Sequence, residues 1–186
     1  VLEARESELQ AEQQEIMGAL MVQFRGEEHT PQQMRRYLED PDAALRREAY
    51  LAALDVRRES WPQLELILDQ LIALRTEVAA NAGYSSYTPF RFEQLQRFDY
   101  DADICFGLHE AIEHEVVPAV ERLNIRRRQQ LDLESLQPWD LEVDPTGRAP
   151  LRPFATQEEL VCLVRHAFGA VDQRFANDFD VLVDGD

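Results

Sequence analysis

The sequence predicts an all-α fold, a lobe of long antiparallel helices with one irregular or hairpin-forming excursion near residues 138–153. Apolar residues recur at helical spacing along most of the chain, and no segment repeats internally. Helix-start signals divide the chain, and prolines gather in one segment, residues 137–155. A length of 186 residues fits one domain or one lobe of a larger protein. We therefore expect residues 1–186 to form a single helical lobe.

The N-terminal half predicts three helices before residue 62. Apolar residues seven positions apart predict the first over residues 1–24, although its end, "ALMVQF", fits a short extended segment equally well. Thr30 followed by proline is an N-cap signal for a short helix that ends near residue 39. Asp40 followed by proline repeats this signal and predicts a helix that ends near Ser60.

The segment 62–82 carries apolar residues around most of the circumference of a helix, which predicts packing on two sides. Pro62 marks either a new helix start or a kink. Gly83 predicts the C-terminal cap. Such a helix must be covered, so we expect the chain to self-associate or to bind a partner.

The C-terminal half predicts a short helix at residues 92–97 and a long helix from Asp99 or Asp101 to about residue 131. Pro118 inside the long helix should remove a hydrogen bond and kink it. Extended pieces of the proline-rich segment favour a small hairpin around residues 145–147. Thr156 and Glu159 form a capping box that opens two last helices, over residues 157–170 and 171–183.

Charge and composition exclude several functions. The net charge of −17 argues against nucleic-acid binding, because phosphate backbones need a positive face. All 19 basic residues are arginine, so lysine-dependent Schiff-base and P-loop chemistry is excluded. The sequence contains no run of 18 apolar residues, so it predicts no membrane span. Cys105 and Cys162 lie far apart, which predicts buried free thiols in a reducing cytosol and thus a cytoplasmic protein.

The stretch "HEAIEH", residues 109–114, looks like a metal site. The zinc-peptidase motif H-E-x-x-H needs its histidines four residues apart on one helix face. His109 and His114 are five apart, about 140° around an α-helix. An exposed helix with polar pairs such as His109 and Glu113 is therefore the favoured interpretation, and a metal site completed from elsewhere is the alternative. Tyr84 and Tyr87 beside Gly83 are more typical of packing than of a peptide cleft.

Four phrases in order carry a family resemblance: "LEDPDAALRREAYLAA", "LRTEVAANAGYSSYTPF", "RFDYDADICFGLHEAIEHEVVPAV" and "PWDLEVDPTGRAPLRPF". Together they resemble the oligoendopeptidase F-like zinc peptidases, relatives of thimet oligopeptidase and neurolysin, over about residues 20–180. The resemblance implies a helical, intracellular enzyme that cleaves short peptides inside a channel between two lobes. It also implies zinc held by H-E-x-x-H and a downstream glutamate, with the motif glutamate as general base.

No H-E-x-x-H occurs in the 186 residues, and "HEAIEH" corresponds to a family segment upstream of that motif. We therefore assign no catalytic, cofactor-binding or metal-ligating residue, and expect no zinc on this chain. The chain begins at Val1, without methionine, which suggests a fragment. The resemblance then implies one wall of the channel, with the C-terminal catalytic lobe as its partner. Two alternatives are a free-standing helical interaction module and an enzyme that binds metal through His109, Glu113 and other carboxylates.

Overall fold

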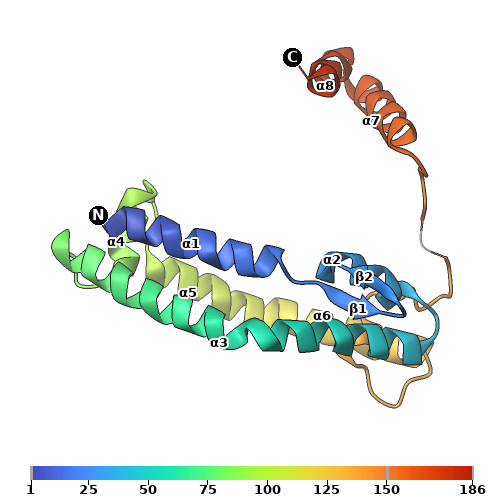
Figure 1. The fold of residues 1–186 in the computed structure, drawn as a ribbon, viewed down its shortest axis with the longest axis horizontal. Coiled ribbons are helices and arrows are strands. Elements are labelled where there is room, and N and C mark those ends of the chain that lie inside the picture. Colours follow the sequence, from blue (N-terminus) through green and yellow to red (C-terminus); the bar gives the residue numbers. More distant parts are fainter. Residues whose placement is uncertain (1, 150, 186) are drawn as a thin grey trace. The chain divides into compact units, whose positions relative to one another are not determined.

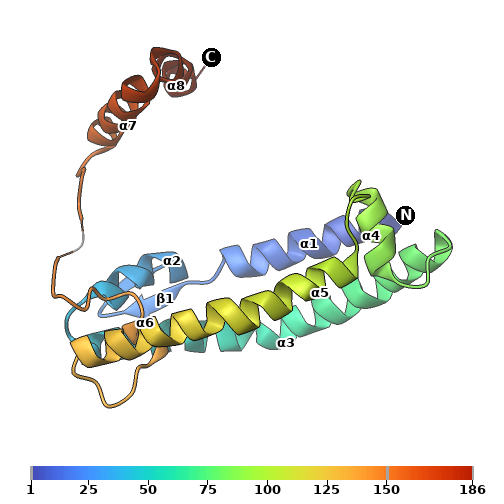
Figure 2. The same ribbon diagram turned by 180° about the vertical axis from the view of Figure 1, so that it is seen from behind.

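A computed structural model describes residues 2–149 and 151–185 (Figures 1 and 2). It confirms the predicted fold class, because helices account for nearly all regular structure and the described residues contain one two-stranded antiparallel sheet. The chain divides into two compact units, residues 1–147 and residues 148–186. The single lobe expected from the sequence therefore stays a prediction. No helix in the described ranges has the length and apolarity that crossing a membrane requires.

The first unit is built on an antiparallel pair, α1 (Leu2–Gly18) and α3 (Ala43–Asn81) (Figure 1). Leu9 of α1 is fully buried against Ile67 and Leu71 of α3. The Arg75 guanidinium of α3 also forms an ion pair with Glu6, at an Nε–Oε1 distance of 2.8 Å. One side of the predicted 62–82 segment is therefore covered within the unit.

α3 continues through Pro62 as one helix of 39 residues, so the helix end predicted near Ser60 and the new start at Pro62 are wrong, while the alternative of a kink stays a prediction. The N-terminal cap is Asp42 rather than the predicted Asp40: the Asp42 carboxylate accepts a hydrogen bond from the Ala44 N–H, and that of Asp40 accepts from the Asp42 N–H. Gly83, at φ +83°, ends the helix as predicted, and the Tyr84 N–H donates to the Ala79 carbonyl in a Schellman turn.

The hairpin of this protein lies at its N-terminal end, in β1 (Val22–Phe24) and β2 (Glu27–His29). Val22 pairs with His29, and Phe24 with Glu27. Arg25 and Gly26 both have positive φ, as the tightest hairpin turns require. The extended alternative for "ALMVQF" is thus correct, and the first helix ends at residue 18.

The hairpin joins the largest buried cluster of the unit. Val22 and Phe24 pack with Met34 of α2 (Pro31–Met34) and with Ala49 and Ala53 of α3. α2 begins at the predicted Thr30 cap and continues into the 3₁₀ segment η1 (Arg35–Glu39). This burial stabilises the hairpin, since a two-stranded hairpin alone is only marginally stable in water.

α4 (Tyr87–Gln94) begins five residues and ends three residues before the helix predicted at residues 92–97, which it overlaps. The predicted long helix then forms, with Asp101 as its cap, but in three consecutive segments: α5 (Ala102–Ala111), the π-helical turn η2 (Ile112–Val116) and α6 (Val117–Gln130) (Figure 2). The Val117 N–H donates to the carbonyl of Ile112, five residues back. The predicted interruption of the hydrogen-bond pattern before Pro118 is confirmed and is a π turn, while the predicted kink stays a prediction.

The proline-rich segment 137–155 is irregular rather than hairpin-like. Among its described residues the only regular element is the 3₁₀ turn η3 (Pro138–Asp140), so the irregular alternative for this excursion is correct and the hairpin alternative around residues 145–147 is not. Gly147 does adopt a turn at φ +74°, but the segment is held by side chains of the helices rather than by strand pairing.

The second unit contains a helical pair, α7 (Gln157–Val171) and α8 (Gln173–Asp184). The predicted capping box of Thr156 and Glu159 opens α7. Phe168 and Phe179 meet at a ring-centroid distance of 5.5 Å, and Ala176 of α8 is buried. The pair therefore has its own small contact surface.

Candidate functional site

The "HEAIEH" stretch spans the end of α5 and the π turn, and every residue in it is exposed. Positions five apart lie nearer to each other in a π turn than the α-helical estimate of about 140° implies. Nevertheless, no group of three or more His, Cys, Asp or Glu side chains in the described part of the chain could hold a metal ion. The ring of His109 contacts Phe106, and the structure brings neither His109 nor Glu113 into a ligand cluster.

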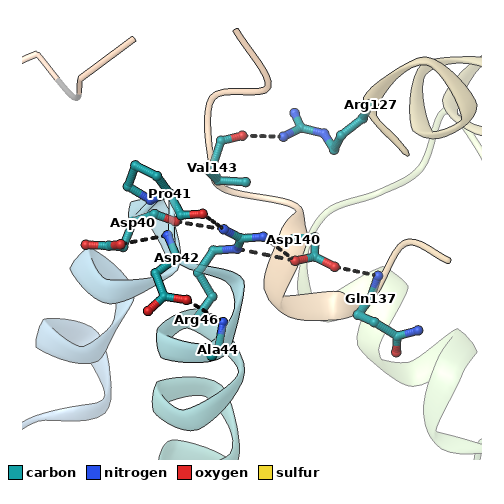
Figure 3. A network of polar contacts seen from close by, with 9 residues as sticks. All are labelled: Asp40, Pro41, Asp42, Ala44, Arg46, Arg127, Gln137, Asp140 and Val143. Atoms are coloured by element: carbon teal, nitrogen blue, oxygen red, sulfur yellow. Dashed lines mark hydrogen bonds and ion pairs between the residues drawn. The ribbon is translucent and has the colours of Figure 1, made fainter. Parts of the chain in front are cut away.

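The most buried polar site lies where α3 meets the proline-rich segment (Figure 3). Arg46 and Asp140 are each only 2% exposed, and the Arg46 Nη2 lies 2.7 Å from the Asp140 Oδ1. Nε of Arg46 donates to the same oxygen at 3.3 Å, and Nη1 donates to the carbonyls of Asp40 and Pro41 at 2.8 and 2.9 Å. The second Asp140 oxygen accepts from the Gln137 N–H at 3.0 Å. Both charges are thus fully hydrogen-bonded, as burial requires.

Further contacts hold the same segment against the helices. The Arg127 guanidinium of α6 donates to the Val143 carbonyl at 2.7 Å, and the Val143 side chain is buried (Figure 3). Glu142 pairs with Arg35 at 2.9 Å on the surface. The ring of Trp139 lies 5.6 Å from the Tyr50 ring. This network holds the proline-rich segment against the helices. Each of its charged side chains is hydrogen-bonded within it, so none of them is a candidate nucleophile, acid or base.

Sequence reasoning missed the Arg46–Asp140 pair. Both residues lie inside phrases that carry the family resemblance, but nothing local indicates that a guanidinium and a carboxylate 94 positions apart are buried together. Periodicity would have offered one clue, because Arg46 occupies a buried position of α3 one turn before Ala49 and two before Ala53.

The aromatic residues after α3 form the second notable cluster. Tyr84 packs edge-on against Phe90, and its hydroxyl donates to the Glu93 carboxylate, which raises the pKa of Tyr84 above its ordinary value. Tyr87 lies under the Arg75 guanidinium at 5.4 Å. The packing role expected for both tyrosines is therefore satisfied. Beside them, between α4 and the start of α5, is a cavity of about 380 Å³.

The predicted free cysteines are confirmed, but their predicted burial is wrong. Cys105 is half-buried in α5 and Cys162 is exposed on α7. Both belong to helices that leave one side uncovered, so a thiol on either helix keeps contact with solvent.

The α5–η2–α6 segment exposes a row of large apolar side chains. No residue in its three elements is buried. Nine large apolar residues are between 41% and 61% exposed: Ile104, Phe106, Leu108, Ile112, Val116, Val117, Val120, Leu123 and Ile125. So many exposed large apolar side chains on one helical segment are uncommon on an isolated monomer and are typical of an interface.

Solved structures show where such a fold occurs. A protein provisionally described as oligoendopeptidase F superposes on 97% of the chain with a TM-score of 0.90 and 26% identity. PZ peptidase A, solved with an inhibitor, matches 97% with a TM-score of 0.90 and 24% identity. An oligoendopeptidase F from Bacillus anthracis strain Ames, also a provisional description, matches 96% with a TM-score of 0.86 and 21% identity. No curated protein matches the chain.

These matches define the class as a helical peptidase-type fold, and the chain spans about a third of the length of each matching structure. The particular family follows from the sequence. Residues 36–174 match the profile of Peptidase family M3, and the chain belongs to that family. The residues present do not fit the zinc site that the resemblance implies, because the chain contains neither H-E-x-x-H nor a cluster of metal-ligating side chains among its described residues.

Proposed function

We propose that residues 1–186 form a helical lobe of an oligoendopeptidase F-like zinc metallopeptidase that hydrolyses short peptides. The lobe forms one wall of the substrate channel, and zinc is held by residues outside it. The observation that carries this proposal is the match of 97% of the chain, at a TM-score of 0.90, to about a third of a larger peptidase chain. The family match over residues 36–174 supports the same assignment.

The exposed apolar row of α5, η2 and α6 supports a partner for this lobe. Burial of apolar surface contributes about 25 cal/mol per Å², so covering these nine side chains would stabilise the protein substantially. The proposed partner is the C-terminal catalytic lobe of the same enzyme. When that lobe is absent, a second copy of the chain can cover the row. The two free cysteines agree with a cytoplasmic enzyme.

The test compares residues 1–186 with the full-length protein on a quenched fluorogenic peptide. The full-length protein should hydrolyse the peptide, lose activity with a chelator and recover it with zinc. Residues 1–186 alone should show only background hydrolysis. Chelator-sensitive turnover by residues 1–186 would contradict the assignment of zinc to residues outside them, and a full-length protein without hydrolysis would contradict the proposed activity.

Light scattering across a dilution series tests the partner. Residues 1–186 should associate with one another, or with the separately expressed remainder of the protein when it is supplied. A strict monomer that ignores the remainder would favour a free-standing helical interaction module instead.

A further inference from the structure

The cavity between α4 and α5 combines aromatic walls with an acidic rim. Phe92 and Tyr100 meet at a centroid distance of 5.7 Å and an interplanar angle of 69°. Phe98 forms a third aromatic wall and is 75% exposed, so burial in the lobe does not explain its place there. The volume of the cavity, about 380 Å³, lies at the small end of the range for ligand pockets.

The cavity carries a negative charge. Glu93, Asp101 and Asp103 contribute three carboxylates, against one guanidinium from Arg97. Asp101 caps α5, and Glu93 accepts from Tyr84. No described residue donates a hydrogen bond to the Asp103 carboxylate, which is therefore available at the rim. Aromatic faces and carboxylates both attract cations, whereas a neutral apolar ligand would use only the rings.

Arg97 already shows how a cation fits this cavity. Its guanidinium carbon lies 5.5 Å from the centre of the Phe92 ring and 5.9 Å from that of Tyr100. Gln96, directly before Arg97, adopts φ +56° in the turn that ends α4. This left-handed conformation is strained for residues other than glycine. The Arg97 N–H closes this turn by donating to the Phe92 carbonyl at 2.9 Å. A strained backbone that supports a ligand-sized cavity is typical of a functional site.

We propose that this cavity is a subsite for the basic side chain of a peptide, and that Arg97 occupies it as an internal competitor when no peptide is bound. The subsite rests on the proposed function, because it names the kind of peptide that the lobe prefers. An incoming arginine or lysine displaces the Arg97 guanidinium from the two rings and places its charge beside Asp103. The net charge of −17 also favours the approach of basic peptides.

The experiment measures equilibrium binding to the full-length protein, treated with a chelator so that the peptide is not cleaved. Four labelled heptapeptides differ only at the central residue, which is arginine, lysine, citrulline or leucine. Fluorescence anisotropy should give about 3- to 10-fold tighter binding for arginine and lysine than for their neutral counterparts. Equal affinity for arginine, citrulline and leucine would overturn the subsite.

Three variants test whether residues of the cavity cause the preference for basic peptides. Phe98→Ala and Asp103→Asn should each reduce the arginine preference, while the matched controls Phe175→Ala and Asp99→Asn, whose residues lie outside the cavity lining, should preserve it. Arg97→Ala should strengthen binding of the arginine peptide several-fold, because it removes the competitor. The affinity for the citrulline peptide should stay unchanged. Weaker arginine binding in Arg97→Ala, or full preference in Phe98→Ala and Asp103→Asn, would refute the proposal.

The two proposals fail separately. Chelator-sensitive hydrolysis without any preference for basic peptides would overturn the subsite alone. Selective binding of the arginine peptide by a protein that cleaves no peptide would overturn the proposed activity alone.

Discussion

Replacing Asp140 with alanine should lower the free energy of unfolding of residues 1–147 by about 3–5 kcal/mol, the usual cost of removing one partner from a buried ion pair. Two contacts of the Asp140 carboxylate are lost in this variant. The variant leaves the Arg46 guanidinium, 2% exposed, without its counter-charge, although two carbonyls still accept from its Nη1. It also leaves the Gln137 N–H without the carboxylate oxygen that accepts its hydrogen bond.

The matched control is Glu142→Ala, two residues further along the same segment. Glu142 pairs with Arg35 at 2.9 Å, but the two side chains are 31% and 56% exposed. Its loss should therefore cost about 1 kcal/mol or less. A second comparison replaces the buried pair by apolar residues, Arg46→Met with Asp140→Leu. This double variant should recover much of the stability lost in Asp140→Ala, because no unpaired charge remains buried.

Urea unfolding followed by tryptophan fluorescence measures these differences. Trp139 adjoins Asp140 and reports on the anchored segment, so all variants should carry Trp61→Phe to remove the second signal. In thermal melts the loss corresponds to a fall in Tm of about 6–20 °C, at roughly 2–4 °C per kcal/mol for this size. An Asp140→Ala variant as stable as Glu142→Ala would refute the structural importance of the pair.

Two further predictions concern metal and protonation. Calorimetry on residues 1–186 should detect no stoichiometric tight zinc, because the described residues form no ligand cluster; one tight zinc per chain that disappears in His109→Ala would restore the metal-binding alternative. The hydrogen bonds from Arg174 to Asp172 lower the pKa of that carboxyl below its ordinary value of 3.8. Its stabilising contribution is therefore present above that value and is lost as the pH falls through the lowered pKa. Carboxyl titration by NMR should show the Asp172 midpoint rising in Arg174→Ala, and an unchanged midpoint would contradict this cause.

The helix starts were predictable because capping is local. Thr30, Asp101 and Thr156 each accept a hydrogen bond from a backbone N–H three residues ahead, so a short stretch of sequence contains the whole interaction. α4 was misplaced for the same reason. Its N-cap residue, Ser86, makes no side-chain capping hydrogen bond, and its left-handed terminal residue is Gln96 rather than glycine.

The hairpin could not be located from sequence because two segments offer similar turn signals. Gly26 and Gly147 both adopt positive φ. Only the first is flanked by side chains, Val22 and Phe24, that a core formed with α3 buries. The second lies in a segment held by Arg46 and Arg127, and neither contact is visible in the local sequence. The family could be recognised from four sequence phrases that occur in the expected order. The buried pair of Arg46 and Asp140 and the aromatic cavity could be found only in the three-dimensional structure.

The π turn before Pro118 sets the rotational phase of everything that follows it. In an uninterrupted α-helix, residues four apart advance by about 40°, so the series from Ile104 through Leu108 and Ile112 to Val116 would wind steadily around the axis. The π turn takes about one residue more than an α turn and rotates later positions back by roughly 100°. The apolar residues of α6 are thereby realigned with those of α5. Deleting one residue between Ile112 and Val116 would restore a regular α-helix and keep this alignment, because the π turn accommodates the one residue by which this segment exceeds an α-helix of the same phase. The same residues wound as an uninterrupted α-helix would instead turn the apolar residues of α6 about 100° away from those of α5.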